Sequence, residues 1–143
     1  MLNEGDLKSK VIFDGLVEHV VYHDHEMRVT WANKSSCEAA GLSRSKVIGQ
    51  YCYKIWAKTN KLCPDCPVYK AMQSGKPQSV TKTTKDGRIW FIRGYPLNDK
   101  DGKVKGGIEL SLEITEQELA FKALQESEEK FRNLSESSYD AIF

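Results

Sequence analysis

The sequence predicts an α+β fold in which a five-stranded antiparallel sheet carries short helices on one face, an N-terminal helix and a long C-terminal exit helix. Three observations support this prediction. Two strand-like segments lie near the N-terminus, short helical segments fill the middle, and three strand-like segments separated by tight turns follow. A chain of 143 residues is long enough for one domain with its own core.

The first segments predict a helix and two strands. Residues 6–17 have an apolar stripe at helical spacing, and Asp6 can cap that helix. Residues 18–23 and 27–32 contain valine, tyrosine and tryptophan, whose shapes suit an extended backbone. We therefore expect the sheet to begin directly after the first helix.

The middle of the chain predicts short helices around a cysteine-rich loop. Asn33 stands at the position of a helix cap before a short helix over 35–40. The cysteine-rich loop covers residues 52–66. Residues 67–74 predict another helix, because proline occupies its first turn and Gly75 follows its end.

The rest of the domain is rich in strands. Residues 78–84, 88–95 and 104–114 predict three strands joined by the turns KDG and DKDG. The last strand alternates apolar and polar residues, so we expect one of its faces to meet solvent. The strand over 88–95 has bulky apolar residues on both sides, so both of its faces should be covered.

The exit helix is predicted from residue 115 to about residue 135. It is amphipathic, and glutamates stand four residues before a lysine or arginine at three places. Its apolar seam consists of four residues: Phe121, Leu124, Phe131 and Leu134. Because no later strand covers this seam, we expect a homodimer formed through the flanking helices. The alternative is a helix that packs back on its own domain.

A short pattern near the N-terminus recurs near the C-terminus. The pattern F-x-x-L-x-E occupies residues 13–18 and again residues 131–136, a distance that matches one small domain. It suggests one complete module followed by the entry to a second. We therefore predict four segments: an N-terminal flanking helix (1–17), a sensor-like domain (18–114), an amphipathic linker helix (115–135) and the truncated start of a second domain (136–143).

Composition excludes several classes of function. The 21 basic and 20 acidic residues give a net charge of +1, so we expect neither nucleic acid nor a membrane surface as partner. No apolar stretch approaches a membrane span or a signal peptide, which favours a cytoplasmic location. No phosphate loop, nucleophile with supporting histidine and carboxylate, or hydrolase metal motif is present, so we expect no enzyme activity from the chain itself.

The cysteine-rich loop is the strongest candidate site. Cys52, Cys63 and Cys66 follow the spacing C-x10-C-x2-C, and two thiols two residues apart suit a metal ion. Zinc and an iron–sulfur cluster are therefore possible cofactors, although both usually need a fourth ligand. The fourth cysteine, Cys37, lies in a predicted helix and reads as a small buried residue.

Two other interpretations of this loop stay open. Cys66 precedes Pro67 and can cap the following helix, whose dipole would lower the pKa of the thiol and favour redox sensing. The segment C-P-x-C is also similar to the active-site spacing of glutaredoxins, which raises a thiol–disulfide oxidoreductase using Cys63 and Cys66 as the alternative function. A third interpretation is that the cysteines only pack as small residues.

The predicted interior is a second candidate site. Six residues are candidates for lining a ligand pocket there: Trp31, Tyr53, Trp56, Trp90, Ile92 and Arg93. The alternative is that the aromatic residues only fill the core. Arg93 could pair with a ligand carboxylate or with an acidic side chain of the protein.

The order of several short motifs resembles the PAS sensor domains over roughly residues 9–117. The motifs are VTWAN at the end of the second strand, GLS followed by VIG, the two turns KDGR and DKDG, and the exit sequence EITE at 113–116. The exit motif of the family usually begins with aspartate, where this chain has Glu113. The segment from Glu128 onward is similar to the opening of a second such domain.

This resemblance implies a sensor that binds a small ligand or cofactor, or senses redox state, and relays the signal through the exit helix. The relay would involve Glu113, Ile114 and Thr115, and the output would be a downstream domain such as a histidine kinase or a cyclic-dinucleotide enzyme. The flavin-binding segment of the family is absent, and no histidine lies beyond residue 25, so we expect neither flavin nor haem. A pure dimerisation module is a further alternative.

Overall fold

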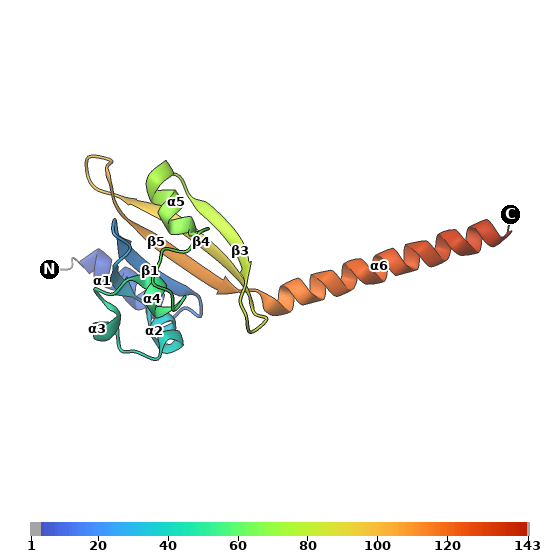
Figure 1. The fold of residues 1–143 in the computed structure, drawn as a ribbon, viewed down its shortest axis with the longest axis horizontal. Coiled ribbons are helices and arrows are strands. Elements are labelled where there is room, and N and C mark those ends of the chain that lie inside the picture. The colour runs from blue at the N-terminus through green and yellow to red at the C-terminus, as the bar shows by residue number, and fades with distance from the viewer. Residues whose placement is uncertain (1–3, 143) are drawn as a thin grey trace.

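The computed structural model describes the backbone of residues 4–142 and the side chains of residues 8–135. The predicted α+β fold is confirmed (Figure 1). In chain order the elements are α1 (Glu4–Asp14), β1 (His19–Asp24), β2 (Val29–Ala32), α2 (Lys34–Ala40), α3 (Arg44–Val47), α4 (Cys52–Ile55), α5 (Pro67–Ser74), β3 (Gln78–Thr83), β4 (Ile89–Asn98), β5 (Val104–Glu113) and α6 (Thr115–Ile142).

The five strands form one antiparallel sheet in the order β2-β1-β5-β4-β3. The N-terminal strand pair and the C-terminal meander therefore meet where β1 pairs with β5. β4 runs three residues beyond its predicted end, because Pro96, Leu97 and Asn98 continue the pairing with β5. Pro96 is tolerated there because the register between β4 and β5 shifts just after it, between Leu97 and Asn98.

Two apolar clusters fill the space between the sheet and the helices α2 to α5. The first is built around the buried residues Val21, Val29, Ala32, Cys37 and Val47. The second is built around Met27, Cys66 and Val68, with Cys52 and Cys63 packed against it. Cys37 is buried, as predicted, and it belongs to the first cluster while the other three thiols contact the second.

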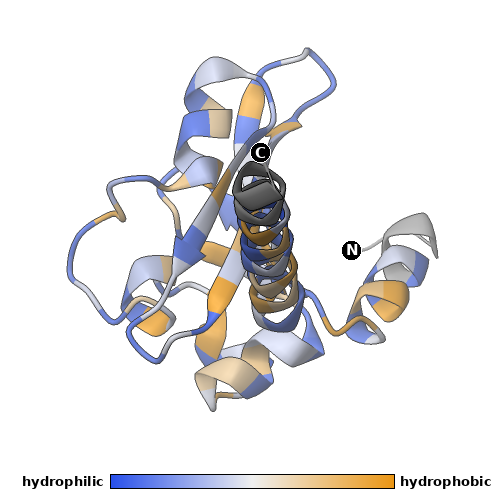
Figure 2. Cartoon of the chain, turned by 90° about the vertical axis from the view of Figure 1, so that its right-hand side faces the viewer, coloured by the Kyte–Doolittle hydropathy of each residue, from blue (hydrophilic) through white to orange (hydrophobic). Residues whose placement is uncertain are grey.

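The helix α1 lies across the sheet from α5 (Figure 2). Its Phe13 ring contacts the rings of Tyr22 and Trp31, with centroids 6.3 Å away in both cases. By strand register, the half-buried residues Ile108, Leu110 and Leu112 of β5 share this outer face. The apolar half of the alternating strand thus faces away from α5.

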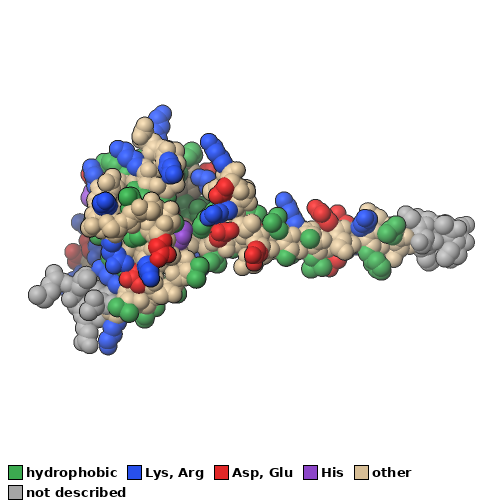
Figure 3. Space-filling view, turned by 90° about the horizontal axis from the view of Figure 1, so that it is seen from below, with side chains coloured by type: hydrophobic (Ala, Val, Ile, Leu, Met, Phe, Trp, Pro, Cys, Tyr) green, Lys and Arg blue, Asp and Glu red, His purple; other side chains and the backbone are tan. Residues whose placement is uncertain are grey.

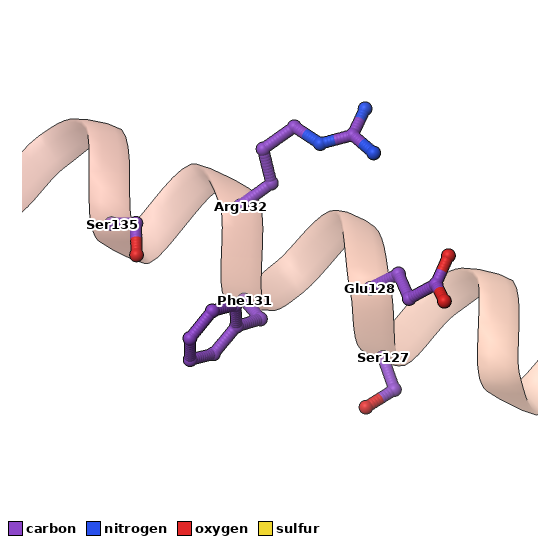
Figure 4. Close-up of a pocket in the computed structure, with 5 residues that line it drawn as sticks. All are labelled: Ser127, Glu128, Phe131, Arg132 and Ser135. Carbon is purple, nitrogen blue, oxygen red and sulfur yellow. The ribbon is translucent and has the colours of Figure 1, made fainter.

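The exit helix projects from the sheet into solvent (Figures 1 and 3). All four residues of the predicted apolar seam are more than half exposed: Phe121, Leu124, Phe131 and Leu134. The hollow in Figure 4, which Phe131 lines with Arg132, is formed by α6 alone and is therefore helix surface. Within the described chain, the seam does not pack back on its own domain.

The backbone of residues 136–142 continues α6, so the helix extends beyond the predicted end at residue 135. Phe143 and residues 1–3 lie outside the described residues. The proposal that 136–143 begins a second domain therefore stays a prediction. In the part of the chain that the structure describes, no helix is both long and apolar enough to cross a membrane.

Candidate functional site

The sheet face that α5 covers carries polar groups in its centre. Glu109 and Ser111 of β5 point to this side, because Gly107 on the same face lies directly beneath Val68 and Met72 of α5. His23 of β1 is on the same side, opposite Gly107 in the strand register. A polar surface under a helix layer is unusual, and it makes this interior the candidate site.

Two glycines set the position of α5. A Cβ atom at Gly94 would lie 2.5 Å from the carbonyl atoms of Pro67 and from the nitrogen of Val68. A Cβ atom at Gly107 would lie 2.5 Å from Cγ1 of Val68. The first turn of α5 therefore rests directly on β4 and β5. Because Gly94 pairs with Glu109 in the register, this turn lies beside the Glu109 carboxyl.

We expect Gly94→Ala to lower the free energy of unfolding by about 2 kcal/mol, because the new methyl group meets backbone atoms that side-chain rotation cannot clear. Urea unfolding followed by tryptophan fluorescence measures the change. Gly15→Ala is the matched control, since its new methyl group would meet only the Ile12 carbonyl oxygen, at an ordinary 3.4 Å. Equal effects of the two substitutions would contradict the close packing of α5 against β4 and β5.

The three cysteines of the predicted site lie together near the start of α5, where this helix rests on β4 and β5. Cys66 is the N-cap of α5 and is 8% exposed, while Cys52 on α4 and Cys63 in the loop are half-buried. All three contact the second apolar cluster. Among the described residues, however, no group of three or more histidine, cysteine, aspartate or glutamate side chains is arranged to hold a metal ion.

The predicted low pKa of the Cys66 thiol is wrong. Burial raises its pKa to about 11, and it outweighs the backbone N–H groups of Tyr69 and Val68 at the helix start, which lower it. Burial likewise raises the pKa of Cys52, with Glu109 and the other two thiols adding to the effect. The cap position was correct, but the depth of burial decides the direction. Both thiols are therefore protonated at neutral pH.

Glu109 is a candidate functional residue that the sequence did not reveal. Burial raises the pKa of its carboxyl to about 7, against the smaller lowering by a hydrogen bond with Ser111 and by the Lys82 ammonium. The signal in the sequence was Gly107 two residues before it, whose missing side chain leaves room for α5 on that strand. A carboxyl with a pKa near neutrality is typical of functional sites.

His23 is the second missed residue. Its side chain is 2% exposed, and neither ring nitrogen has a hydrogen-bond partner among the described atoms. Burial lowers its pKa to about 4, so the ring is neutral at pH 7. Buried polar groups without partners are rare because each costs on the order of 1–3 kcal/mol.

The six predicted pocket residues do not line one pocket. Trp90 and Ile92 lie on the interior face, opposite Glu113 and Ser111 in the register. Trp56 packs against the first apolar cluster, and its indole N–H donates to the carbonyl of Ser36, while Tyr53 packs against the second.

Trp31 and Arg93 lie on the outer face of the sheet, because side chains alternate between the two faces along a strand and these two pair with outer-face residues. Trp31 pairs with Tyr22, and its ring receives the Arg44 guanidinium at 5.0 Å. Arg93 forms an ion pair with Glu18 at 3.6 Å. The prediction that these two line the interior with Trp90 is therefore wrong.

The predicted relay residues form a hydrogen-bonded junction between the sheet and α6. The Thr115 hydroxyl accepts the N–H of Ile89 at 2.9 Å and donates to the Glu113 carboxylate at 2.9 Å. The N–H of Ile114 donates to the carbonyl of Ile89 at 2.8 Å. The first residue of α6 is thus tied to the first residue of β4. Glu113 bonds to Thr115, whereas Asp86 of the KDG turn accepts bonds from Thr84 and from the N–H of Arg88 within that turn.

His19 lies between the interior face of the sheet and this junction. Its ring lies 5.3 Å from the Trp90 ring, on the strand that pairs with β5. Burial lowers the pKa of His19, and the neighbouring Glu113 carboxylate raises it in part. Glu109, Ser111 and Glu113 therefore form a polar row along one face of β5, from the start of α5 to the start of α6.

We expect Thr115→Val to lower the free energy of unfolding by about 1 kcal/mol, because valine keeps the shape but loses the hydroxyl bonds to Ile89 and Glu113. Hydrogen exchange at the start of β4 should become faster. Thr81→Val, on an exposed position of β3, is the matched control. Unchanged exchange in Thr115→Val would argue against the junction.

Comparison with protein families gives one match. The family model described as the PAS fold matches residues 13–119. No curated protein matches the sequence significantly.

Solved structures share the fold at low sequence identity. VqmA bound to DPO, a protein of Vibrio cholerae whose dimer and target DNA are also described, is 19% identical with a TM-score of 0.61. That match covers 78% of this chain and 58% of VqmA, so the chain spans little more than half of that relative.

Two isolated PAS domains match over nearly their whole length. The PAS domain of Bordetella pertussis BvgS is 20% identical with a TM-score of 0.55, covering 86% of this chain and 96% of that one. The PAS domain of the histidine kinase ThkA is 18% identical with a TM-score of 0.51, covering 66% and 97%.

Proposed function

Because the chain belongs to the PAS-fold family, we propose that it is a sensor module that detects a chemical change in its interior and relays it through α6. The observation that carries this proposal is the polar row on the helix-covered face of β5. It joins the thiols and Glu109 at the start of α5 to Glu113 and Thr115 at the start of α6. In this proposal these two groups are the ends of the relay along β5.

The stimulus acts, in this proposal, on the group formed by Cys52, Cys63, Cys66 and Glu109, which we call the thiol–carboxyl cluster. Its members influence one another electrostatically, because Glu109 and Cys63 both raise the pKa of the Cys66 thiol. A change of charge, bonding or occupancy at any of them therefore alters the others. A small ligand or a change of redox state would each produce such a change.

The readout is the exit helix. We propose that two chains pair through the seam on α6, because this exposed apolar stripe projects clear of the domain. The Thr115 junction then biases how the two helices pair, which is the two-state element that a signal needs. A downstream output such as a histidine kinase would receive the signal; ThkA, one similar protein, is a histidine kinase.

The experiment uses anaerobically purified protein and the variant Cys66→Ser. Absorption spectra and elemental analysis for zinc and iron define what the cluster holds. Hydrogen exchange of α6 and sedimentation are then measured after adding zinc, chelator or glutathione disulfide. We expect at least one addition to change exchange at residues 115–135 in the wild type and not in the variant. No change in either protein under any addition would overturn the proposal.

The alternative function, a thiol–disulfide oxidoreductase using Cys63 and Cys66, is distinguished by turnover. Such enzymes need rapid exchange at both cysteines, whereas burial raises the pKa of Cys66 to about 11 and leaves little thiolate for fast turnover. We therefore expect no catalytic reduction of insulin disulfides by dithiothreitol above the uncatalysed rate. A pure dimerisation module instead predicts that Cys66→Ser changes stability only.

A further inference from the structure

The segment between Cys63 and Cys66 is a hydrogen-bonded turn. The N–H of Cys66 donates to the carbonyl of Cys63 at 3.2 Å, and Pro64 occupies the position of a turn that proline favours. Such a turn holds its first and fourth Cα atoms within about 7 Å. Disulfides span Cα separations of roughly 4.4–6.8 Å. The backbone thus already holds these two cysteines near bonding distance.

The two thiols differ in access to solvent. Cys63 is half-buried in the loop, whereas Cys66 is 8% exposed at the start of α5. Both are free and both contact the same apolar cluster. Cys63 is therefore the thiol that meets a small molecule first, and Cys66 is the thiol placed to displace it.

We propose that Cys63 and Cys66 form a reversible disulfide at the start of α5 by exchange with a low-molecular-weight disulfide, an inference that rests on the proposed sensor function. Cys63 attacks one sulfur of the small disulfide, whose other half leaves as a thiol with the Cys63 proton. Cys66 then attacks the Cys63 sulfur, and the second half leaves as a thiol with the Cys66 proton. Two protein thiols lose two electrons, and one small disulfide gains them.

The new bond would act on α5 directly. In the reduced protein the thiol of Cys66, the N-cap residue of α5, lies near the backbone N–H groups of Val68 and Tyr69 but makes no capping hydrogen bond. A bond to Cys63 redirects that sulfur and pulls on Cys66, whose carbonyl accepts the N–H of Lys70 in the first turn of α5. Because this turn rests on Gly94 and Gly107 without spare room, its displacement is transmitted to β4 and β5.

The test equilibrates the whole chain in glutathione buffers, blocks free thiols and digests with trypsin. Cleavage after Lys61 and Lys70 releases residues 62–70, which contain Cys63 and Cys66 and no other cysteine, while Cys52 leaves in residues 47–54. We expect residues 62–70 to appear two hydrogens lighter and unblocked. Their oxidised fraction should rise from about a tenth to about nine tenths over roughly a hundredfold change in the ratio of oxidised glutathione to the square of reduced glutathione.

Three variants define the outcome. Cys52→Ser should keep this transition, whereas Cys63→Ser and Cys66→Ser should abolish it. Two results overturn the pairing: a peptide that links Cys52 to residues 62–70, or thiols that stay blocked in every buffer. Hydrogen exchange of α6 in the same samples separates the two proposals. A response of α6 to zinc without a disulfide leaves the sensor function standing, and a disulfide without a response of α6 leaves only the pairing.

Discussion

Replacing Asn33 by alanine should lower the free energy of unfolding by about 4 kcal/mol, since a buried amide loses bonds to several segments at once. The side chain is fully buried. Its oxygen accepts the N–H of Val20 at 3.0 Å and the N–H of Ser36 at 3.2 Å. Its nitrogen donates to the carbonyls of Phe13 and Glu18, both at 2.8 Å.

The size of the effect follows from what truncation leaves behind. Alanine fills only part of the site, so the N–H of Val20 and the carbonyls of Phe13 and Glu18 remain without their partner in a buried setting. Each such group costs on the order of 1–3 kcal/mol, far more than one lost surface bond. Asn33 thus joins the end of α1, the start of β1 and the start of α2.

Urea unfolding followed by tryptophan fluorescence measures this change. Asn33→Asp separates the helix cap from the bonds to Phe13 and Glu18. Aspartate keeps the oxygen that caps α2 but places a second oxygen against the carbonyls of Phe13 and Glu18. We expect it to be as damaging as alanine. Asn98→Ala, at an exposed position of β4, is the control and should change stability by less than about 0.5 kcal/mol. If Asn33→Ala lowered the free energy of unfolding by less than about 1 kcal/mol, the Asn33 side chain would not hold these three segments together.

Asn33 also shows what sequence can predict. Its position before an apolar helix predicts the cap on Ser36, which is confirmed, because capping is local. Its bonds to Phe13 and Glu18 could not be predicted, since they depend on how a loop 15 to 20 residues earlier returns to the helix. The same limit applies to Cys66, whose cap position is local but whose pKa depends on the burial that β4 and β5 impose.

The alternation of β5 predicts that its two faces differ, but not which face the helices cover. Gly94 and Gly107 decide this, because they let α5 lie on the polar side. Trp31 and Arg93 were misplaced for a related reason. Their orientation follows from the pairing with β1 and β5, which aromatic or charged character alone does not reveal. The fold was predictable from local patterns, whereas the site depended on long-range register.

The second large effect is the contribution of Glu109 to the pH dependence of stability, which Glu109→Gln removes. In the folded protein burial raises the pKa of Glu109 to about 7, against an ordinary value of 4.5. The folded state therefore holds this proton more tightly than the unfolded chain. Its contribution to stability is complete below pH 4.5 and is lost as pH rises through 7. The pKa difference corresponds to about 3 kcal/mol, an upper bound because the side chain is only half-buried.

Glutamine cannot ionise, so Glu109→Gln should be more stable than the wild type by up to about 3 kcal/mol at pH 8 and nearly equal to it at pH 4.5. Urea unfolding at a series of pH values measures both. Glu116→Gln, exposed in the first turn of α6, is the control and should run parallel to the wild type. Parallel curves for Glu109→Gln and the wild type would show that the pKa of Glu109 is the same in the folded and the unfolded protein.

His23 should produce the opposite slope, which makes its contribution separable. Burial lowers its pKa to about 4 from an ordinary 6.5, so its contribution to stability is complete above pH 6.5 and is lost as pH falls through 4. Between pH 4.5 and 6.5 the two slopes oppose each other and should nearly cancel in the wild type. His23→Leu should therefore expose a falling curve over this range, and Glu109→Gln a rising one. Because the charge of Glu109 changes near pH 7, small changes at the neighbouring thiols or at Lys82 are enough to switch it, which is the property that a sensing carboxyl requires.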